Sequence, residues 1–326
     1  MRTGSASAAA KRERLVSPWL IAGLFGATIF AFVLLFPAPA LKRELARAHS
    51  VNAVILDYLQ LLVRASPQAH QARLLLAKKA LQVHDTALAK VALEPWLRQP
   101  IADETRRVGR LRLELEHNLV YSSPAGSATR NERITRWSHM LRALRPRLGY
   151  DQLIATAHNA RALGLYRDAA TLAFMAIHRT HDANARRQAF RYGLASLVAG
   201  NLPGRALKAA ARYRSAVPMT ADLWVYLAQI ALAANAAEQA AAYELHYLAV
   251  TTTPQGRRRA LLAALRALIA AGRPCAALAT AAIYLHRIPP DAALWRFLTR
   301  LALASDRPRL AAHYAAYLVG LTQPGT

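Results

Sequence analysis

The chain has 326 residues, of which 54% are hydrophobic, so it is long enough to bury one large core or two. Alanine is abundant, glycine is scarce and runs of β-branched residues are rare, which favours close-packed helices over a sheet. The single cysteine, Cys275, excludes an intramolecular disulfide and a cysteine-based zinc cluster. We expect it to be a small core residue at the start of an alanine-rich helix.

The formal net charge is +25, from 43 Lys and Arg against 18 Asp and Glu. A field of this sign attracts nucleic acid, acidic lipid headgroups, acidic proteins or anionic polymers. The alternative is a solvated basic surface, because the arginines are scattered over the chain. The one tight run, Arg257–Arg259, has the same two interpretations, a solvated face or a local contact for an anion.

The N-terminal region predicts a membrane anchor. A basic tail, residues 1–17, precedes the 18 uncharged residues Trp19–Phe36, which nearly cross a bilayer core at 1.5 Å per residue. Residues 18–37 are therefore expected to form one transmembrane helix, with Trp19 at the interface. A cleaved signal peptide ending at Ala38-Pro39-Ala40 is the alternative, although the apolar segment is long and the prolines make a poor cleavage site. The Lys and Arg distribution favours a cytoplasmic N-terminus, with the body across the membrane.

Helical spacing of apolar residues continues after the anchor. It predicts helices over Val51–Ala65, Ala69–Gln82, Thr86–Leu97 and Ile101–Val120. Residues 41–145 are expected to be degenerate helical repeats, and residues 146–326 regular ones.

The segment Tyr121–Asn131 contains Ser, Pro, Gly and Ala without periodicity, which predicts an exposed loop. It is either a domain boundary or a loop inserted within a repeat. The second interpretation is preferred, because helix resumes at Glu132–Leu144 with the repeat phase kept.

Turn residues recur at a nearly constant interval through the chain. We expect them at His84, Gly164, Gly200, Asn235, Gly272 and Asp306, and after a first gap of 80 residues the spacings are 36, 35, 37 and 34. A period of 34–37 residues is typical of stacked helix pairs. An alanine follows each turn by five or six positions, where a small side chain lets paired helices approach: Ala89, Ala169, Ala206, Ala240, Ala277 and Ala311. Prolines are expected to close units at Pro218, Pro254, Pro289 and Pro324.

The stretch Asp222–Pro254 shows one such unit, a helix, a turn near Asn235 and a second helix, whose apolar faces need neighbours. Its Trp224, Leu227 and Ala228 resemble the aromatic-Leu-small pattern of the tetratricopeptide repeat, and Trp295, Leu298 and Thr299 match it again. Ala77, Ala157 and Gly193 also fit the small slot. The resemblance covers about residues 50–322 and implies an all-α solenoid of antiparallel helix pairs.

A narrower resemblance lies just after the anchor. The region is similar to the one that follows the membrane anchor in Pel exopolysaccharide secretion proteins of the PelB type, through Tyr58, Leu59, Leu62, Arg64, Pro67, Arg73, Leu75, Leu76 and Ala77. It implies a bacterial inner-membrane anchor with periplasmic repeats. The chain lacks the alternating strands of an outer-membrane barrel, so it is either the scaffold half of a divided system or another anchored repeat protein. A lipopolysaccharide-assembly type needs paired CxxC motifs, and a haem-biosynthesis-associated type needs two spans; neither fits.

No sequence motif points to catalysis. The chain has no phosphate-binding G-x-x-x-x-G-K-[ST], no G-x-G-x-x-G and no H-E-x-x-H, so no enzyme activity, cofactor or metal is expected. His178 and His181, beside Asp182, suggest a metal site only if one helix presents both; otherwise they sit at a helix C-terminus. The acidic pairs, Asp103-Glu104 and Glu114-x-Glu116, do not predict a catalytic pair.

In tetratricopeptide repeats the first helix of each pair lines the binding groove. The resemblance implies that the groove residues here are Lys78, His158, Arg161, Arg187, Gln229, Arg266, Arg296 and Arg300. Most are cationic and suit an acidic peptide or an anionic polymer, because guanidinium binds carboxylates in bidentate fashion. Each is equally compatible with a solvated polar position.

The last predicted helix, Leu310–Leu321, carries Tyr314, Tyr317, Leu318 and Leu321 with nothing to cover them. Solenoids normally end in a polar repeat, so this helix is expected to pack on a partner or a second copy. The leading hypothesis is an inner-membrane scaffold that docks components of exopolysaccharide export in the periplasm. The second is a cytoplasm-facing adaptor or quality-control protein that binds acidic client segments. The third is an enzyme built on an α-solenoid.

Overall fold

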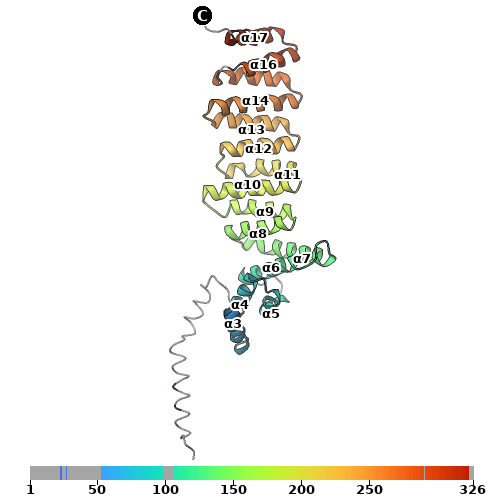
Figure 1. Ribbon diagram of the computed structural model, residues 1–326, viewed down its shortest axis with the longest axis vertical. Helices are drawn as coiled ribbons and strands as arrows, with labels where there is room; N and C mark the ends of the chain where they lie inside the picture. The colour runs from blue at the N-terminus through green and yellow to red at the C-terminus, as the bar shows by residue number, and fades with distance from the viewer. Residues whose placement is uncertain (1–22, 24–26, 28–52, 99–105, 290, 323–326) are drawn as a thin grey trace, which may run out of the picture. The chain divides into compact units, whose positions relative to one another are not determined.

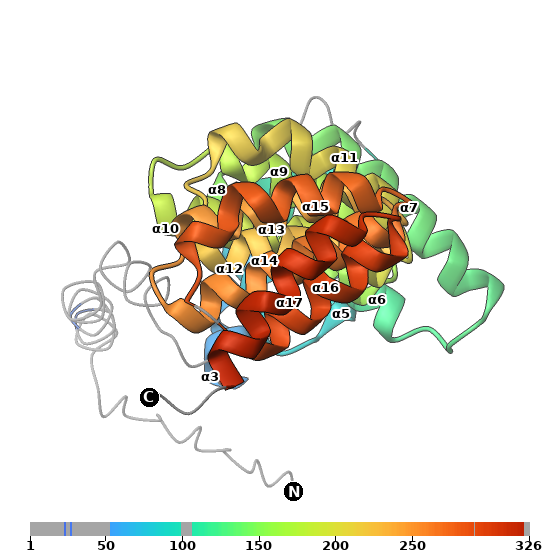
Figure 2. The same ribbon diagram turned by 90° about the horizontal axis from the view of Figure 1, so that it is seen from above.

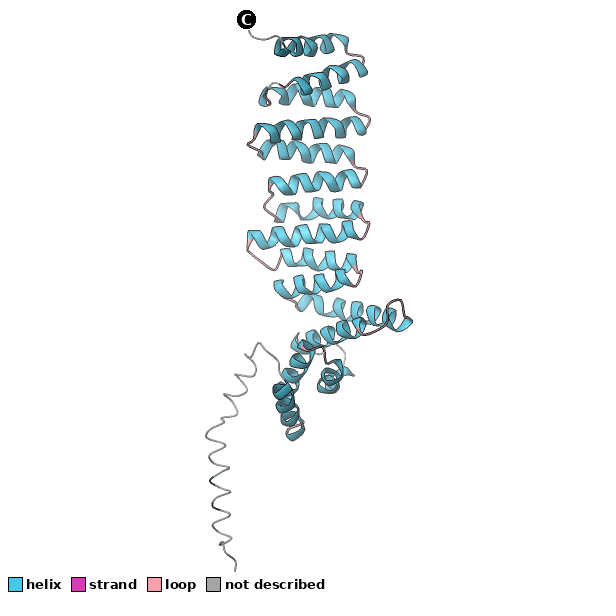
Figure 3. Ribbon diagram, viewed as in Figure 1, coloured by secondary structure: helices cyan, strands magenta, loops and turns pink. Residues whose placement is uncertain are grey.

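The computed structural model describes residues 53–98, 106–289 and 291–322, together with Gly23 and Ala27. Every regular element in these ranges is helical, with 15 α-helices named α3 to α17 and three short 3-10 helices (Figure 3). Apart from Gly23 and Ala27, the expected anchor Trp19–Phe36 lies outside the described residues. None of the described helices is both long enough and apolar enough to cross a membrane.

The chain divides into two compact units, residues 1–124 and 125–326, so the division falls within the segment expected to be a loop. The first unit contains α3 (Ala53–Ala65), α4 (His70–Gln82), α5 (Thr86–Leu97) and α6 (Arg106–Tyr121). These helices match the four expected in this region. Ala77, Ala80, Ala89 and Leu93 are buried where α4 and α5 pack together, since the alanines let the two backbones approach.

The loop expected over Tyr121–Asn131 is shorter than predicted. Helix α6 ends at Tyr121, and α7 (Ala128–Leu144) begins four residues before the predicted start at Glu132. The hydroxyl of Ser127 accepts a hydrogen bond from the backbone N–H of Arg130, 3.2 Å away, and so caps the helix. The polar composition of this segment is therefore that of a helix N-terminus as well as of a loop.

In the second unit, α8 to α17 form a stack in which each helix packs against the next in sequence (Figures 1 and 2). The stack consists of α8 (Tyr150–Ala162), α9 (Tyr166–Ile177), α10 (Ala183–Ala199), α11 (Pro203–Tyr213), α12 (Ala221–Ala233), α13 (Ala237–Val250), α14 (Pro254–Ala270), α15 (Pro274–Tyr284), α16 (Ala292–Ala304) and α17 (Pro308–Thr322). The 3-10 turns η2 (Arg145–Arg147), η3 (Arg214–Ala216) and η4 (Leu285–Arg287) follow α7, α11 and α15.

Each helix pair turns through one residue in the left-handed region, with φ between 54° and 76°: His84, Gly164, Asn201, Asn235, Gly272 and Asp306. Five of the six predicted turn residues are confirmed, and the prediction of Gly200 is wrong by one position. Asparagine tolerates this conformation. Gly200 is small for a different reason, because a Cβ there would lie 2.7 Å from the Cβ of Tyr166.

All six predicted alanines lie five residues after the left-handed residue and are buried. Their role in close helix approach is therefore confirmed. Gly193 has a similar role inside α10, since an added Cβ would lie 2.6 Å from Cε1 of Phe174. Of the prolines, Pro218 and Pro289 follow 3-10 turns, but Pro254 opens α14 rather than closing α13, and Pro324 lies outside the described residues. Proline lacks an N–H, which the first helical position does not need.

The second unit repeats with a period of 71 residues. The left-handed residues Gly164, Asn235 and Asp306 are 71 apart, as are Asn201 and Gly272. The same shift carries α8 onto α12 and α16, α10 onto α14, α11 onto α15 and η3 onto η4 with identical lengths. The predicted period of 34–37 residues is thus half of a longer unit of four helices, here called the block. The first block is α8–α11, the second is α12–α15, and a third begins with α16 and α17.

Side-chain contacts recur with the same period. The Nε of Arg186 donates to the carbonyl of Thr180 at 3.0 Å, and 71 residues later Arg257 donates to Thr251 at 3.1 Å. Arg258 pairs with Asp291 at 3.0 Å. Two members of the Arg257–Arg259 run are thus engaged within the fold.

The tryptophans of the repeat pattern pack within their own pairs. Trp224 stacks on His246, with ring centroids 4.4 Å apart, and 71 residues later Trp295 stacks on Tyr317 at 4.7 Å. Tyr314, which the sequence left uncovered at the end of the stack, is buried 5.7 Å from the Trp295 ring. Tyr317 is half exposed and Leu318 half-buried, while the side chain of Leu321 lies outside the described residues.

Candidate binding surface on the first helices of the pairs

The first helices of the five pairs, α8, α10, α12, α14 and α16, can be compared by counting back from each left-handed residue. Five of the eight predicted groove residues lie six positions before that residue: His158, Gln229, Arg266 and Arg300 in the second unit, and Lys78 in the first. In the second unit we call this set, with Ala195 of α10, the −6 row. The four predicted side chains of the row are exposed, whereas Lys78 is half-buried.

The other three predicted residues occupy different positions. Arg161 lies three before the turn and is half-buried beside His158. Arg296 is exposed and its Nε donates to the carbonyl of Ala292 at 3.3 Å. Arg187 lies in the first turns of α10 and donates to the side chain of Asn184. Of these three residues, only Arg161 therefore forms a local site with a member of the −6 row, His158.

A second row, missed by sequence reasoning, is apolar. Three positions before the left-handed residue, four large aliphatic side chains are exposed: Val198 by 37%, Leu232 by 50%, Ile269 by 37% and Leu303 by 59%. We call these four residues the −3 row, and Arg161 is their counterpart on α8. The next position is an exposed alanine on every first helix: Ala162, Ala199, Ala233, Ala270 and Ala304. Single exposed aliphatics are ordinary, but these four recur at one position on successive first helices.

A cationic and aromatic cluster joins α8, α10 and α12. The rings of His158 and Tyr192 are 4.3 Å apart, and the guanidinium carbon of Arg161 lies 5.6 Å from the centre of the Tyr192 ring. The guanidinium carbon of Arg191 lies 5.8 Å from the centre of the Tyr226 ring. Contacts of this kind attract a cation to the ring face and hold the guanidinium in place.

The electrostatics of the cluster favour an anion. Burial raises the pKa of both Tyr192 and Tyr226, with Arg161 acting in the opposite direction on each, so the phenols stay neutral at physiological pH. Within the described part of the chain, neither Arg161 nor Arg191 forms an ion pair. The site can therefore accept a carboxylate or a phosphate without breaking an internal ion pair.

A shallow, open cavity of about 460 Å³ lies at this cluster, lined by His158, Arg161, Ala162, Tyr166, Tyr192 and Ala199. Ala162 and Ala199 have short side chains, which leave the cavity unfilled on their side. Tyr166 can line the cavity because Gly200, which it approaches closely, has no side chain. Sequence reasoning named His158 and Arg161 but missed the tyrosines, which come from a second helix and from the next pair.

The second block is a natural control for this cavity. At the positions 71 residues later, His158 is replaced by Gln229, Arg161 by Leu232, Tyr166 by Ala237 and Tyr192 by Ala263. The helices keep the same starts and the same left-handed turns in both blocks. The second block thus forms the same helices and turns without these cationic and aromatic side chains.

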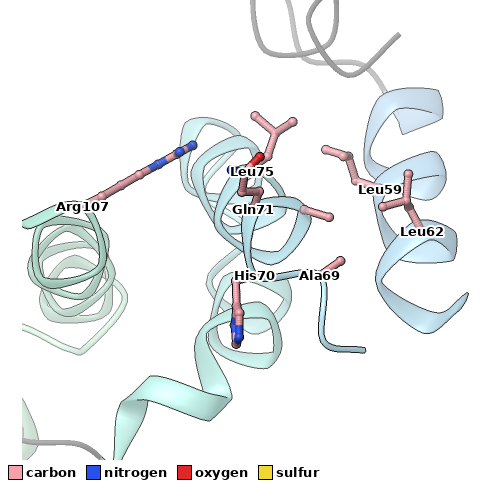
Figure 4. Close-up of a pocket in the computed structure, with 8 residues that line it drawn as sticks. Leu59, Leu62, Ala69, His70, Gln71, Leu75 and Arg107 are labelled. Atoms are coloured by element: carbon pink, nitrogen blue, oxygen red, sulfur yellow. The ribbon is translucent and has the colours of Figure 1, made fainter. Parts of the chain in front are cut away.

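A second cavity, of about 590 Å³, lies in the first unit among α3, α4 and α6 (Figure 4). Leucines 59, 62 and 75 form its apolar side, and Arg107 points toward it from α6. None of the predicted groove residues lines it.

The other residues considered in the sequence do not assemble a site. Helix α9 ends at Ile177, so His178 and His181 do not share a helical face, and Asp182 instead caps α10 by accepting from the N–H groups of Asn184 and Ala185. No group of three His, Cys, Asp or Glu side chains among the described residues could hold a metal ion.

Cys275 is exposed, so the prediction of a core position is wrong; it is the second residue of α15, on the solvent side of the first turn. Glu114 and Glu116 belong to α6, whereas Asp103 and Glu104 lie outside the described residues.

Comparison with known proteins adds no relative: no protein-family model matches the chain, and a search of curated proteins returned no match. The class that the structure defines is an all-helical protein built from packed, adjacent helix pairs.

Proposed function

We propose that this protein is a membrane-tethered scaffold of tetratricopeptide type, which binds an acidic partner protein on the first helices of its repeats. The tether is the uncharged segment Trp19–Phe36, and the body faces the periplasm. By analogy with PelB-type proteins, the partner is a component of exopolysaccharide assembly or export. The scaffold acts by effective concentration, since tethering raises the local level of a bound partner at the membrane.

The observation that carries the proposal is the cationic character of one face. His158, Arg161, Arg266 and Arg300 come from three different pairs and form no ion pair within the described residues. Guanidinium groups in such a row bind carboxylates with geometric specificity.

The second candidate is an adaptor that faces the cytoplasm and binds acidic client segments through the same face. Fusions at the C-terminus separate the two. Alkaline phosphatase is active only outside the cytoplasm, so its activity supports the periplasmic scaffold. Fluorescence of a cytoplasm-restricted reporter together with inactive phosphatase would establish the adaptor instead.

Binding itself is tested in cells with a photocrosslinking residue at position 195, which lies in the −6 row. We expect a defined crosslinked protein whose contact segment is acidic. The paired variant Arg266→Glu and Arg300→Glu should abolish the crosslink. The control Arg205→Glu and Lys208→Glu reverses the same number of exposed charges on α11 and should leave it intact.

A further inference from the structure

The chemistry of the candidate surface changes along the stack. On α8 the two positions hold a histidine and an arginine, His158 in the −6 row and Arg161 at the position of the −3 row. From α10 onward the −3 row is aliphatic, at Val198, Leu232, Ile269 and Leu303, while arginines return to the −6 row on α14 and α16. A ligand that follows the surface therefore meets a histidine and an arginine first and one aliphatic side chain in each later pair.

The shape of the cavity at α8 and α10 favours a macromolecule over a small ligand. It is open to solvent, whereas small-molecule sites bury most of their ligand. The side chains of Arg161 and His158 are already held in place before a ligand binds, because both contact the Tyr192 ring. Less side-chain freedom is then lost when a carboxylate binds.

The aliphatic row distinguishes a polypeptide from a polysaccharide. Sugars and nucleic acid bases stack on aromatic rings. Beyond the cluster, however, the surface exposes Leu232, Ile269 and Leu303, each followed by an exposed alanine. Aliphatic side chains of a polypeptide fit such a surface and bury apolar area there.

We propose that the surface binds a bipartite polypeptide segment, with a cluster of carboxylates on His158, Arg161 and Arg191 and aliphatic residues along the −3 row toward α16. This inference rests on the proposed function and specifies the partner segment. The second block has Leu232 in place of Arg161 and Gln229 in place of His158, so the carboxylates bind at the first block. The position of the acidic cluster therefore fixes the direction of the segment along the stack.

Three synthetic peptides of equal length test the proposal by fluorescence anisotropy with the full chain. The first has four acidic residues followed by spaced leucines, the second has the acids changed to their amides, and the third has the leucines changed to serines. We expect the first to bind about tenfold more tightly than either of the others, with affinity falling steeply as salt rises.

Two variants place the acidic end. Arg161→Leu installs the residue of the second block and should reduce the affinity for the first peptide about tenfold, to that of the amide peptide. Arg205→Ala installs the second-block residue on α11 and should change nothing.

Equal binding of all three peptides, or an unchanged affinity in the Arg161→Leu chain, overturns the proposal. Tight binding of an acidic polysaccharide such as polygalacturonate with no peptide binding assigns the site to a glycan and also overturns it. The crosslinking result at position 195 stands independently, so failure here leaves the proposed function open to its own test.

Discussion

The contact between Gly193 of α10 and Phe174 of α9 gives the sharpest test of the packing. A Cβ at position 193 would lie 2.6 Å from Cε1 of Phe174. The ring cannot move away freely, because it is buried and stacked on Tyr213 at 4.7 Å. In the second block the corresponding pair is Ala264 with Leu245, so a larger residue on one helix accompanies a smaller one on the other.

Gly193→Ala therefore sets two effects against each other. Overpacking of a core costs about 1–3 kcal/mol, and replacing a mid-helix glycine by alanine gains about 1 kcal/mol. We expect a net loss of roughly 0–2 kcal/mol in the parent chain. In a Phe174→Leu background the clash is absent, so the same Gly193→Ala change should stabilise the chain by about 1 kcal/mol.

The assay is a double-mutant cycle on the full chain, with urea unfolding followed by ellipticity at about 222 nm and hydrogen exchange of the α10 amides as a local readout. The expected coupling energy between the two positions is about 1–3 kcal/mol. Ala264→Gly, at the second-block position, serves as the control and should cost about 1 kcal/mol. If the effects of Gly193→Ala are additive with those of Phe174→Leu, the packing argument fails.

Three further predictions test other parts of the structure. Asn235→Ala should destabilise the chain by about 1 kcal/mol and Asn235→Gly should not, because φ is +56° there; thermal unfolding of both variants decides it. Arg257→Ala removes the hydrogen bond to the Thr251 carbonyl and should cost about 1–2 kcal/mol in urea unfolding, whereas Arg205→Ala, at an exposed position, should cost little. Burial raises the pKa of Glu244 above its ordinary 4.5, so the folded chain binds that proton more tightly and stability falls as pH rises through this range. Glu244→Gln should therefore raise the free energy of unfolding at pH 7, and unfolding curves at descending pH should show the gain shrinking toward 4.5.

Local features of the stack could be predicted from the sequence because each depends on a few neighbouring residues. The turn at Asn235 needs a residue that tolerates positive φ, and Ala240 must be small five positions later. Gly200 misled the prediction because glycine serves either a turn or a close approach. Only the position of Tyr166 shows that here it is the second.

The 71-residue block and the candidate surface depend on residues that are far apart in the sequence. Patterns among neighbouring residues therefore do not predict them. Each block consists of two helix pairs, and each pair has its own turn. The turn spacings alone therefore suggest a period of one pair, which is half of the block. Arg161 and Tyr192 come together across two pairs, and neither residue type is unusual in a helix. The exposed Leu232 and Leu303 share the hydrophobicity of core residues, so only their exposure separates them.

The central claim is that the cationic and aromatic side chains of the first block bind a partner and are dispensable for the fold. One chain tests both halves: His158→Gln, Arg161→Leu, Tyr166→Ala and Tyr192→Ala, which together install the residues of the second block. Ellipticity and affinity for the acidic–aliphatic peptide are measured on the same sample. We predict a folded chain with the ellipticity of the parent and an affinity reduced by a factor of at least about 10. A folded chain that retains its affinity, or a chain that loses its helical structure, would contradict the claim.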